Sequence, residues 1–174
     1  VNIAERIEVY KGVVPVEFGG DALGGAINIV TKKTSNTFVD ASYSYGSFNT
    51  HKSNISVGYT AKNGFNVNLN AYQNYSDNNY KVKTRYLDLA TGTFSDDERL
   101  FKRFHGRYPN EALIAKIGFV NTSWADRFLF GINVSQESAD IQNANLMHIV
   151  VGKKKRKADG INPSLTYSKR NLFV

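Results

Sequence analysis

The sequence predicts a mainly β protein whose antiparallel strands carry one apolar and one polar face. Three observations support this fold class. From Phe38 onward, apolar and polar residues alternate with a period of two in one segment after another, which is typical of half-exposed strands. Short turns and long polar loops alternate between these segments. No stretch approaches the roughly 20 consecutive apolar residues that a membrane-spanning helix needs, and the mean hydropathy is -0.37.

Residues 1–33 differ from the rest of the chain because glycines separate two short apolar runs. The runs cover residues 7–10 and 26–30 and are rich in β-branched residues, so they predict two strands. We expect a compact α/β or β-turn unit over residues 1–33 and a separate antiparallel sheet over residues 37–174. The glycines that permit tight turns in the first unit are Gly12, Gly19, Gly20, Gly24 and Gly25.

The clearest alternating segment covers residues 65–72, where apolar residues alternate with three asparagines and Tyr72. Such alternation places all apolar side chains on one face of a strand. A transmembrane β-strand has the same pattern over about 10 residues, with its apolar side against lipid. The side chains expected to face lipid are Val39, Ala41, Tyr43, Ile55, Val57, Phe65, Val67, Leu69, Ile117, Phe119, Phe128, Phe130 and Ile132.

The lengths of the connections indicate an outer-membrane type of β-barrel. Residues 61–64 and 125–127 are expected to be tight turns, whereas residues 76–112 and 138–162 are long, polar and rich in charge. Outer-membrane barrels have short periplasmic turns and long extracellular loops. The alternating segments predict about six transmembrane strands in this chain. Large plugged barrels use about 22 strands, so we expect more strands after Val174.

The segment of residues 4–33, AERIEVYKGVVPVEFGGDALGGAINIVTKK, resembles the end of the plug domain of TonB-dependent outer-membrane receptors. It is similar to the form found in Bacteroidetes-type bacteria, and residues 166–174, TYSKRNLFV, resemble a barrel strand of the same group. The family often has a proline directly after the first glycine, whereas here Val13 and Val14 lie between Gly12 and Pro15. The matching positions are Glu5, Arg6, Ile7, Glu8, Val9, Lys11, Gly12, Phe18, Gly19, Ala22, Gly24, Gly25, Ile27, Asn28, Thr31 and Lys32.

This resemblance implies an importer in the outer membrane of a Gram-negative bacterium. SusC-type glycan importers, a sister class, carry other residues at the positions of Gly12, Gly24 and Gly25. The expected ligand is therefore a ferric siderophore, haem or another metal chelate, with a SusC-like glycan importer as an alternative. The resemblance also implies contact with membrane lipid and lipopolysaccharide. It further implies that a TonB complex drives transport by binding to parts of the receptor outside this chain. It assigns plug–barrel contacts to Arg6, Glu8, Lys11 and Glu17, and a plug turn to Gly19, Gly20, Gly24 and Gly25.

The first long loop interleaves aromatic rings with cations over residues 80–108. Rings and cations together suit an anionic, aromatic ligand through stacking and charge attraction. The same composition suits contacts with lipopolysaccharide, or a loop that packs on itself. The candidate ligand contacts are Tyr80, Lys83, Arg85, Tyr86, Arg99, Lys102, Arg103, Phe104 and His105.

Catalysis and metal binding find no support in the sequence. There is no cysteine, so neither a disulfide nor a thiolate site can form. His51, His105 and His148 are scattered without the spacing of metal ligands, and the acidic residues 96–98 are more consistent with a solvated loop than with acid–base catalysis. The glycine-rich residues 19–25 lack the Lys and Ser or Thr of a nucleotide-binding loop. We therefore predict no enzyme, no metal site and no cofactor.

The net charge of +7 is concentrated in residues 153–157, which are five consecutive basic residues. We expect a solvated loop there, with a patch for an anionic partner as the alternative. Single-stranded nucleic acid requires rings and cations on one face of adjacent strands, but the strand tyrosines share a face with Val, Ile and Leu, so we predict no nucleic-acid partner. The remaining rival is a soluble or surface-exposed β-rich binding or adhesion domain, which predicts closure within this chain and no lipid-facing band.

Overall fold

The computed structural model describes residues 4–18, 24–31, 37–142, 147–149 and 153–170. In this part of the chain the structure is mainly β, with antiparallel sheets and one short 3-10 helix, Val16–Phe18. Among the same residues, no helix has the length and apolar character needed to cross a membrane. The predicted mainly β, antiparallel fold class is confirmed at this level.

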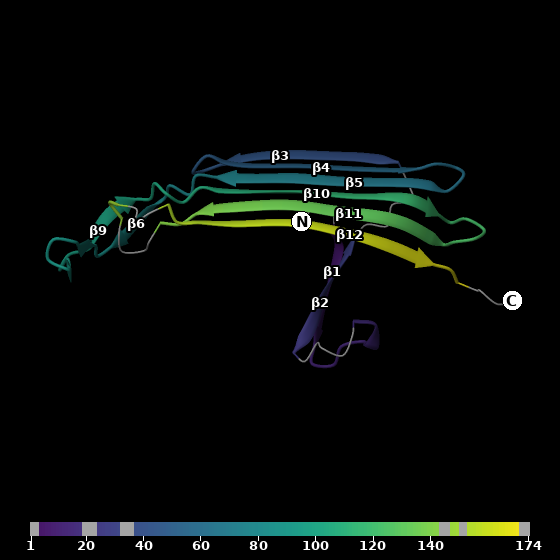
Figure 1. The fold of residues 1–174 in the computed structure, drawn as a ribbon, viewed down its shortest axis with the longest axis horizontal. Helices are drawn as coiled ribbons and strands as arrows, with labels where there is room; N and C mark the ends of the chain where they lie inside the picture. Colours follow the sequence, from purple (N-terminus) through teal and green to yellow (C-terminus); the bar gives the residue numbers. More distant parts are fainter. Residues whose placement is uncertain (1–3, 19–23, 32–36, 143–146, 150–152, 171–174) are drawn as a thin grey trace.

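Six long strands form the main sheet (Figure 1). Their spatial order is β12-β11-β10-β5-β4-β3, so each strand pairs antiparallel with its neighbours in the chain once residues 77–107, between β5 and β10, are set aside. The outermost strands, β3 and β12, are paired on one side only. The bounds are β3 Phe38–Gly46, β4 Thr50–Thr60, β5 Phe65–Ser76, β10 Tyr108–Val120, β11 Arg127–Asp140 and β12 Lys155–Ser168.

The register places apolar side chains in rows across one face of this sheet. One row consists of Pro163, Ile132, Ala115, Leu69, Val57 and Val39. Side chains two residues away along each strand lie in the next row on the same face. The register therefore confirms that the side chains predicted to face lipid share one face. We call the following set the apolar band: Val39, Ala41, Ile55, Val57, Tyr59, Phe65, Val67, Leu69, Ala71, Leu113, Ala115, Ile117, Phe119, Phe128, Phe130, Ile132, Val134, Ile161, Pro163, Leu165 and Tyr167.

The apolar band has aromatic side chains at both of its ends. At the end with the short turns, Trp124 lies with its ring centroid 6.0 Å from that of Phe119 and 5.5 Å from that of Phe128. At the opposite end, the ring of His51 lies 5.0 Å from Tyr45 and 6.2 Å from Tyr75. On β11 the band covers seven residues, 128–134, which is about 20 Å along the strand.

The opposite face of the sheet is polar. Asn66 and Asn68 on β5 are joined by a hydrogen bond between their carboxamides, and Asn66 also donates to the Thr60 hydroxyl. Gly118 of β10 lies on this face opposite Leu129, where a Cβ atom would overlap the Phe128 carbonyl oxygen. The polar face therefore combines short polar side chains with a glycine that allows close backbone approach.

The structure buries little apolar surface. Its accessible surface is 12398 Å², whereas a compact monomer of 19.4 kDa exposes about 8,500 Å². Among the described residues, Ala125 and Met147 are the buried hydrophobic ones, while Phe130 in the middle of the sheet is 52% exposed. A single sheet with two exposed faces explains this, because no second layer covers the apolar band in the described part of the chain.

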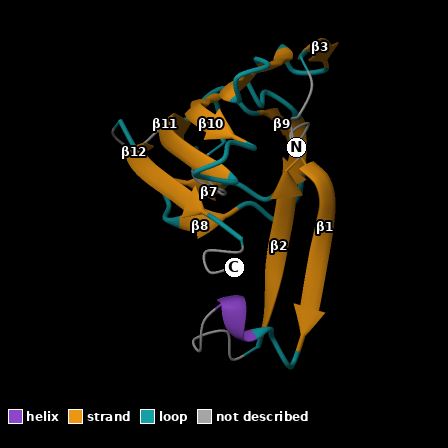
Figure 2. Ribbon diagram, turned by 90° about the vertical axis from the view of Figure 1, so that its right-hand side faces the viewer, coloured by secondary structure: helices purple, strands orange, loops and turns teal. Residues whose placement is uncertain are grey.

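The N-terminal segment forms a sheet of its own. Strands β1, Ala4–Lys11, and β2, Gly25–Thr31, pair antiparallel with each other and not with the main sheet (Figure 2). In Figure 1 this hairpin runs across the direction of the long strands. One side of it exposes four β-branched side chains: Ile7, Val9, Ile27 and Ile29.

Several predicted boundaries were wrong. β10 begins at Tyr108 and β12 at Lys155, so the two long connections shorten to residues 77–107 and 141–154. The tight turn predicted at residues 125–127 is a connection of residues 121–126. The turn of residues 47–49 lies at the same end as the long connections but is short, so the length asymmetry has one exception. Strand pairing continues into charged segments because cross-strand partners are available there.

Candidate functional site at the loop end of the sheet

Three connections meet at one end of the main sheet: residues 47–49, 77–107 and 141–154. We call this end the loop end, and residues 77–107 the arm. The arm is an ordered hairpin extension, since β6, Lys81–Thr84, pairs with β9, Arg99–Lys102, and β7, Leu87–Asp88, pairs with β8, Thr93–Phe94. An extension with its own strands can present side chains in fixed positions.

The root of the arm is fastened to the turn of residues 47–49. The backbone N–H of Asp77 donates to the Phe48 carbonyl at 3.0 Å, and the Phe48 and Tyr80 rings are 5.8 Å apart in an edge contact. Phe48 and Asn49 both have positive φ, 63° and 54°, which most non-glycine residues avoid. The contacts to the arm offset this cost and hold the turn.

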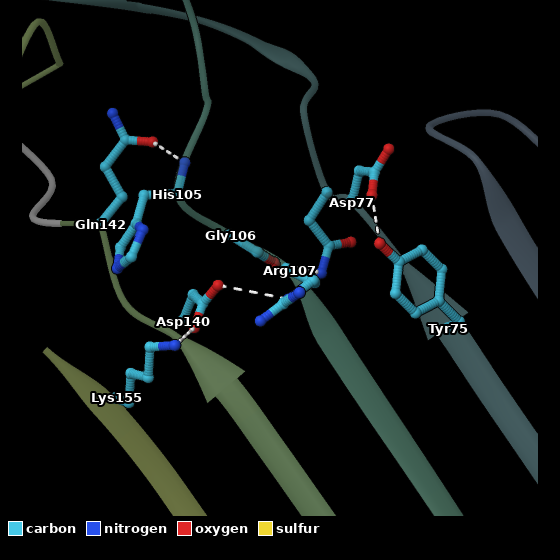
Figure 3. A network of polar contacts seen from close by, with 9 residues as sticks. Tyr75, Asp77, His105, Gly106, Arg107, Asp140, Gln142 and Lys155 are labelled. Carbon is cyan, nitrogen blue, oxygen red and sulfur yellow. Dashed lines mark hydrogen bonds and ion pairs between the residues drawn. The ribbon is translucent and has the colours of Figure 1, made fainter. Parts of the chain in front are cut away.

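A buried glutamine joins the arm to the connection of residues 141–154. The Gln142 side chain is 5% exposed, and its oxygen accepts hydrogen bonds from the backbone N–H groups of Phe104, at 2.9 Å, and His105, at 3.2 Å. Its amide nitrogen donates to the Met147 carbonyl at 3.3 Å. The described part of the second long connection is therefore hydrogen-bonded to the arm through Gln142 (Figure 3).

A row of alternating charges lies where the strands meet these connections (Figure 3). Asp140 at the end of β11 lies between Arg107, whose Nε is 3.4 Å from one carboxylate oxygen, and Lys155, whose Nζ is 3.4 Å from the other. Next in the row, Asp77 accepts a hydrogen bond from the Tyr75 hydroxyl at 2.8 Å. Asp140 is 11% exposed in its side chain, and the two cations compensate the burial of its charge.

The structure uses several of the predicted ligand contacts to hold the arm together. The Arg99 guanidinium lies 5.2 Å from the centroid of Tyr86, whose ring also has edge contacts with Phe101 at 5.6 Å and His148 at 5.9 Å. The alternative that this loop packs on itself therefore describes Tyr86 and Arg99 well.

A second stack lies nearer the sheet. The Arg103 guanidinium lies 5.2 Å from the centroid of Tyr80. Lys83 forms an exposed ion pair with Glu98, with 3.5 Å between nitrogen and oxygen. Arg85, Lys102 and Phe104 are exposed to solvent, as are Tyr80, Lys83 and Arg99. The His105 ring nitrogen Nε2 is buried with no hydrogen-bond partner among the described residues.

A polar pocket lies at the root of the arm, with a cavity volume of about 640 Å³. It contains three predicted ligand contacts, Lys102, Arg103 and Phe104, and Arg107, a further cation of the same loop. The sequence did not single out its other three residues, Asp77, Asn79 and Asp140. We call it the arm-base pocket. Its three cations and two carboxylates suit a polar ligand that carries an anionic group.

Two of the residues predicted as plug–barrel contacts, Arg6 and Glu8, contact each other within the hairpin. Glu8 accepts hydrogen bonds from Asn28 at 2.9 Å, from the Arg6 guanidinium at 2.7 Å and from the Tyr10 hydroxyl at 3.1 Å. The Asn28 amide, followed by Arg6 and Tyr10, holds the pKa of the Glu8 carboxyl below its usual range. Lys11 is exposed at the end of β1.

The predicted plug turn is described only in part. Gly25 has a φ of +135°, and a Cβ atom there would overlap the Tyr10 carbonyl oxygen, so the close pairing of β1 and β2 requires glycine. Gly24 has open space around it. Gly19, Gly20 and the side chain of Glu17 lie outside the described residues.

The prediction of a solvated loop at residues 153–157 was wrong for three of the five residues. Lys155, Arg156 and Lys157 begin β12. Arg156 pairs with Glu137 and Lys155 with Asp140, so two of the five cations are neutralised by carboxylates of β11. Cross-strand charge pairing explains why this segment extends the sheet.

Within the described ranges, no group of three or more His, Asp or Glu side chains is placed to hold a metal ion. Comparison of the chain with models of protein families, with curated proteins and with solved structures finds no match. The family resemblance, the ligand and the location therefore stay predictions, and the geometry of the sheet and its loop end is the basis for a functional proposal.

Proposed function

We propose that this chain is part of a TonB-dependent receptor of the Gram-negative outer membrane, with residues 37–174 supplying strands of the transmembrane barrel and residues 1–33 supplying the end of its plug. Such a receptor imports a scarce ligand, for which a ferric siderophore, haem or another metal chelate is the proposed class. The loop end is then extracellular, and the arm contributes to ligand recognition.

The observation that carries this proposal is the exposed apolar band with aromatic side chains at both ends. Its length on β11 is about 20 Å before the aromatic ends are included, close to the roughly 25 Å apolar height of outer-membrane barrels. Rings of aromatic residues at both membrane interfaces are typical of these proteins. In water, an apolar face of this size is unfavourable unless protein or lipid covers it.

The open edges of β3 and β12 fit the same proposal. A long unpaired strand edge promotes association with other chains, and closure of a barrel removes such edges. The six strands therefore gain partners if further strands complete a barrel. A soluble binding or adhesion domain, the rival function, requires instead that another protein layer cover the apolar band.

Single cysteines test which proposal holds, because this chain contains none of its own. In the full-length protein reconstituted in phospholipid bilayers, a spin label would be attached at Leu69→Cys or, as the matched control, at Asn68→Cys on the opposite face. We expect the label at position 69 to collide with oxygen, which concentrates in lipid, and the label at 68 to be shielded from lipid. Equal access of a water-soluble nickel chelate to both labels would contradict the barrel.

The role of the arm is tested separately. Deleting residues 81–102 removes β6 through β9 but keeps Tyr80 and Arg103 at the root. We expect normal membrane insertion, judged by the migration of unheated protein in a denaturing gel, and reduced binding of ferric siderophores or haem to intact cells. Unchanged binding of every chelate, haem and glycan tried would show that the arm is not a recognition element.

A further inference from the structure

A row of polar side chains interrupts the apolar side of the main sheet. It lies two residues along each strand beyond the row of the apolar band that contains Ala71 and Leu113, and it is on the same face. We call it the Glu111 row, after its central carboxylate. From β3 to β12 it consists of Tyr43, Ser53, Gln73, Glu111, Gln136 and Asp159.

The next row toward the loop end is aromatic. It contains Tyr45, His51 and Tyr75, about 7 Å beyond the Glu111 row. Aromatic side chains mark the level at which an outer-membrane barrel leaves the hydrocarbon. In the proposed barrel the Glu111 row therefore lies on the membrane side of this level, between apolar side chains and aromatic rings. Contact with lipid alone does not account for its polarity, because polar side chains are unfavourable at that depth.

The central side chains of the Glu111 row have no partners within the described part of the chain. Gln73, Glu111 and Gln136 are exposed, and no hydrogen bond or ion pair among the described residues involves their side chains. By contrast, Asp140, further along the same side of β11, pairs with two cations. In a membrane, unpaired amides and carboxylates favour association with a protein surface that supplies hydrogen bonds.

The sheet is hollowed beside the Glu111 row. A groove with a volume of about 460 Å³ is lined by this row, by the adjacent row of the apolar band and by the strand residues between the two. Ala71 lies between Ile55 and Leu113 in the apolar row, and its small side chain leaves room for a partner to approach closely. The surface therefore combines an apolar hollow with a polar rim.

We infer that the Glu111 row is the contact between two copies of this protein in the membrane. This inference rests on the proposed function, because only a membrane-embedded barrel holds the row against lipid. The row is self-complementary, since glutamine amide N–H groups donate and carboxylate oxygens accept. Gln73 and Glu111 are cross-strand neighbours on β5 and β10, so a two-fold axis between these strands brings Gln73 of each copy to Glu111 of the other. Two copies in one membrane also keep their rows at the same depth.

Energy transfer between donor-labelled and acceptor-labelled copies of the full-length protein in phospholipid bilayers tests the inference. The dyes are attached at Lys62→Cys, in the short turn at the far end of the sheet. We expect transfer to rise with the protein-to-lipid ratio. The double substitution of Gln73→Leu and Glu111→Leu, which extends the apolar band, should raise the dissociation constant of the dimer roughly tenfold. Asn74→Leu with Asn110→Leu, the next cross-strand pair on the polar face, is the matched control and should leave it unchanged.

Three outcomes would overturn the inference. The protein could stay monomeric at every ratio, the double variant could keep the dissociation constant of the unaltered protein, or a photocrosslinker at position 73 in intact cells could couple to another protein and not to a second copy. Migration of unheated protein in a denaturing gel separates this inference from the proposed function. A protein that forms no membrane barrel contradicts both, whereas a normal barrel that stays monomeric contradicts only the dimer.

Discussion

The two faces of the main sheet come from the same six strands, yet their side chains differ in chemistry. On the apolar face, large side chains such as Phe130 and Ile117 stand exposed and have no hydrogen-bonding capacity to satisfy. On the polar face, Asn54, Ser56 and Asn133 each have a buried polar atom without a hydrogen-bond partner among the described residues. The first face suits hydrocarbon, and the second suits water or a polar partner. Both requirements are met where the sheet separates lipid from an aqueous interior, as proposed, or where another protein layer covers the apolar face while water covers the polar one.

The largest expected effect comes from charge on the apolar face. Leu69→Arg places a guanidinium in the apolar band, and a cation near the bilayer midplane costs about 2 to 4 kcal/mol of folding free energy in a barrel. Asn68→Arg, one residue away, directs the same side chain to the polar face and should cost much less. Urea titration of the full-length protein in phospholipid bilayers measures both. Equal costs for the two variants would remove the distinction between the faces.

The next effect concerns the close backbone approach on the polar face. Gly118→Ala adds a Cβ atom that overlaps the Phe128 carbonyl oxygen, and because backbone must move, we expect a loss of about 1 to 3 kcal/mol. Gly160→Ala is the matched control, since its Cβ would be 3.0 Å from the Ser135 hydroxyl, which can rotate away. The same urea titration tests both. A stable Gly118→Ala variant would show that this face is less tightly paired than the register indicates.

A smaller effect is expected at the aromatic end of the apolar band. Trp124→Ala removes ring contacts with Phe119 and Phe128, and aromatic pairs contribute about 0.5 to 1.5 kcal/mol each, less where the ring is half exposed. We expect a total loss of about 1 kcal/mol in bilayers. Phe94→Ala, an equally exposed ring on the arm, should leave the stability of the barrel unchanged. Should both variants behave alike, the rings at the short-turn end do not mark a membrane interface.

The faces could be predicted from sequence because alternation is a local property. Residues 65–72 alternate so strictly that the apolar side of β5 is fixed before any partner strand is known. The strand ends could not be predicted in this way. Lys155 belongs to β12 because Asp140 stands opposite it on β11, and no local pattern records that pairing.

At the loop end, sequence alone likewise could not predict which residues of the candidate site contact one another. The sequence identified Tyr86 and Arg99 as ring and cation, but their stacking on each other depends on the pairing of β6 with β9 and the shape of the arm. Gln142 had no sequence signal, because a glutamine in a polar connection is ordinary until its burial and its contacts with Phe104 and His105 are known. The ion pair of Asp140 with Arg107 was missed for a similar reason, since the two residues are separated by 33 positions in the chain and meet only across the sheet.

The smallest expected effect concerns the hairpin, where the Glu8 side of β1 supplies its own hydrogen-bond partners. Because Asn28, Arg6 and Tyr10 favour the ionised carboxylate, the pKa of Glu8 in the folded hairpin lies below that of the unfolded chain, which is about 4.3. A lowered folded-state pKa stabilises the hairpin at pH values above the unfolded pKa, and this contribution is lost as the pH falls through the folded pKa. We therefore expect no change in hairpin stability between about pH 8 and pH 5.5, and a loss only in more acidic solution. Nuclear magnetic resonance titration of the Glu8 carboxyl carbon in the full-length protein measures this pKa, and Asn28→Ala should move it toward the unfolded value because Asn28 is the largest cause of the shift. An unshifted Glu8 in the unaltered protein would mean that the hydrogen bonds from Asn28 and Arg6 do not persist, and that this face of the hairpin depends on outside partners in the way the polar face of the main sheet does.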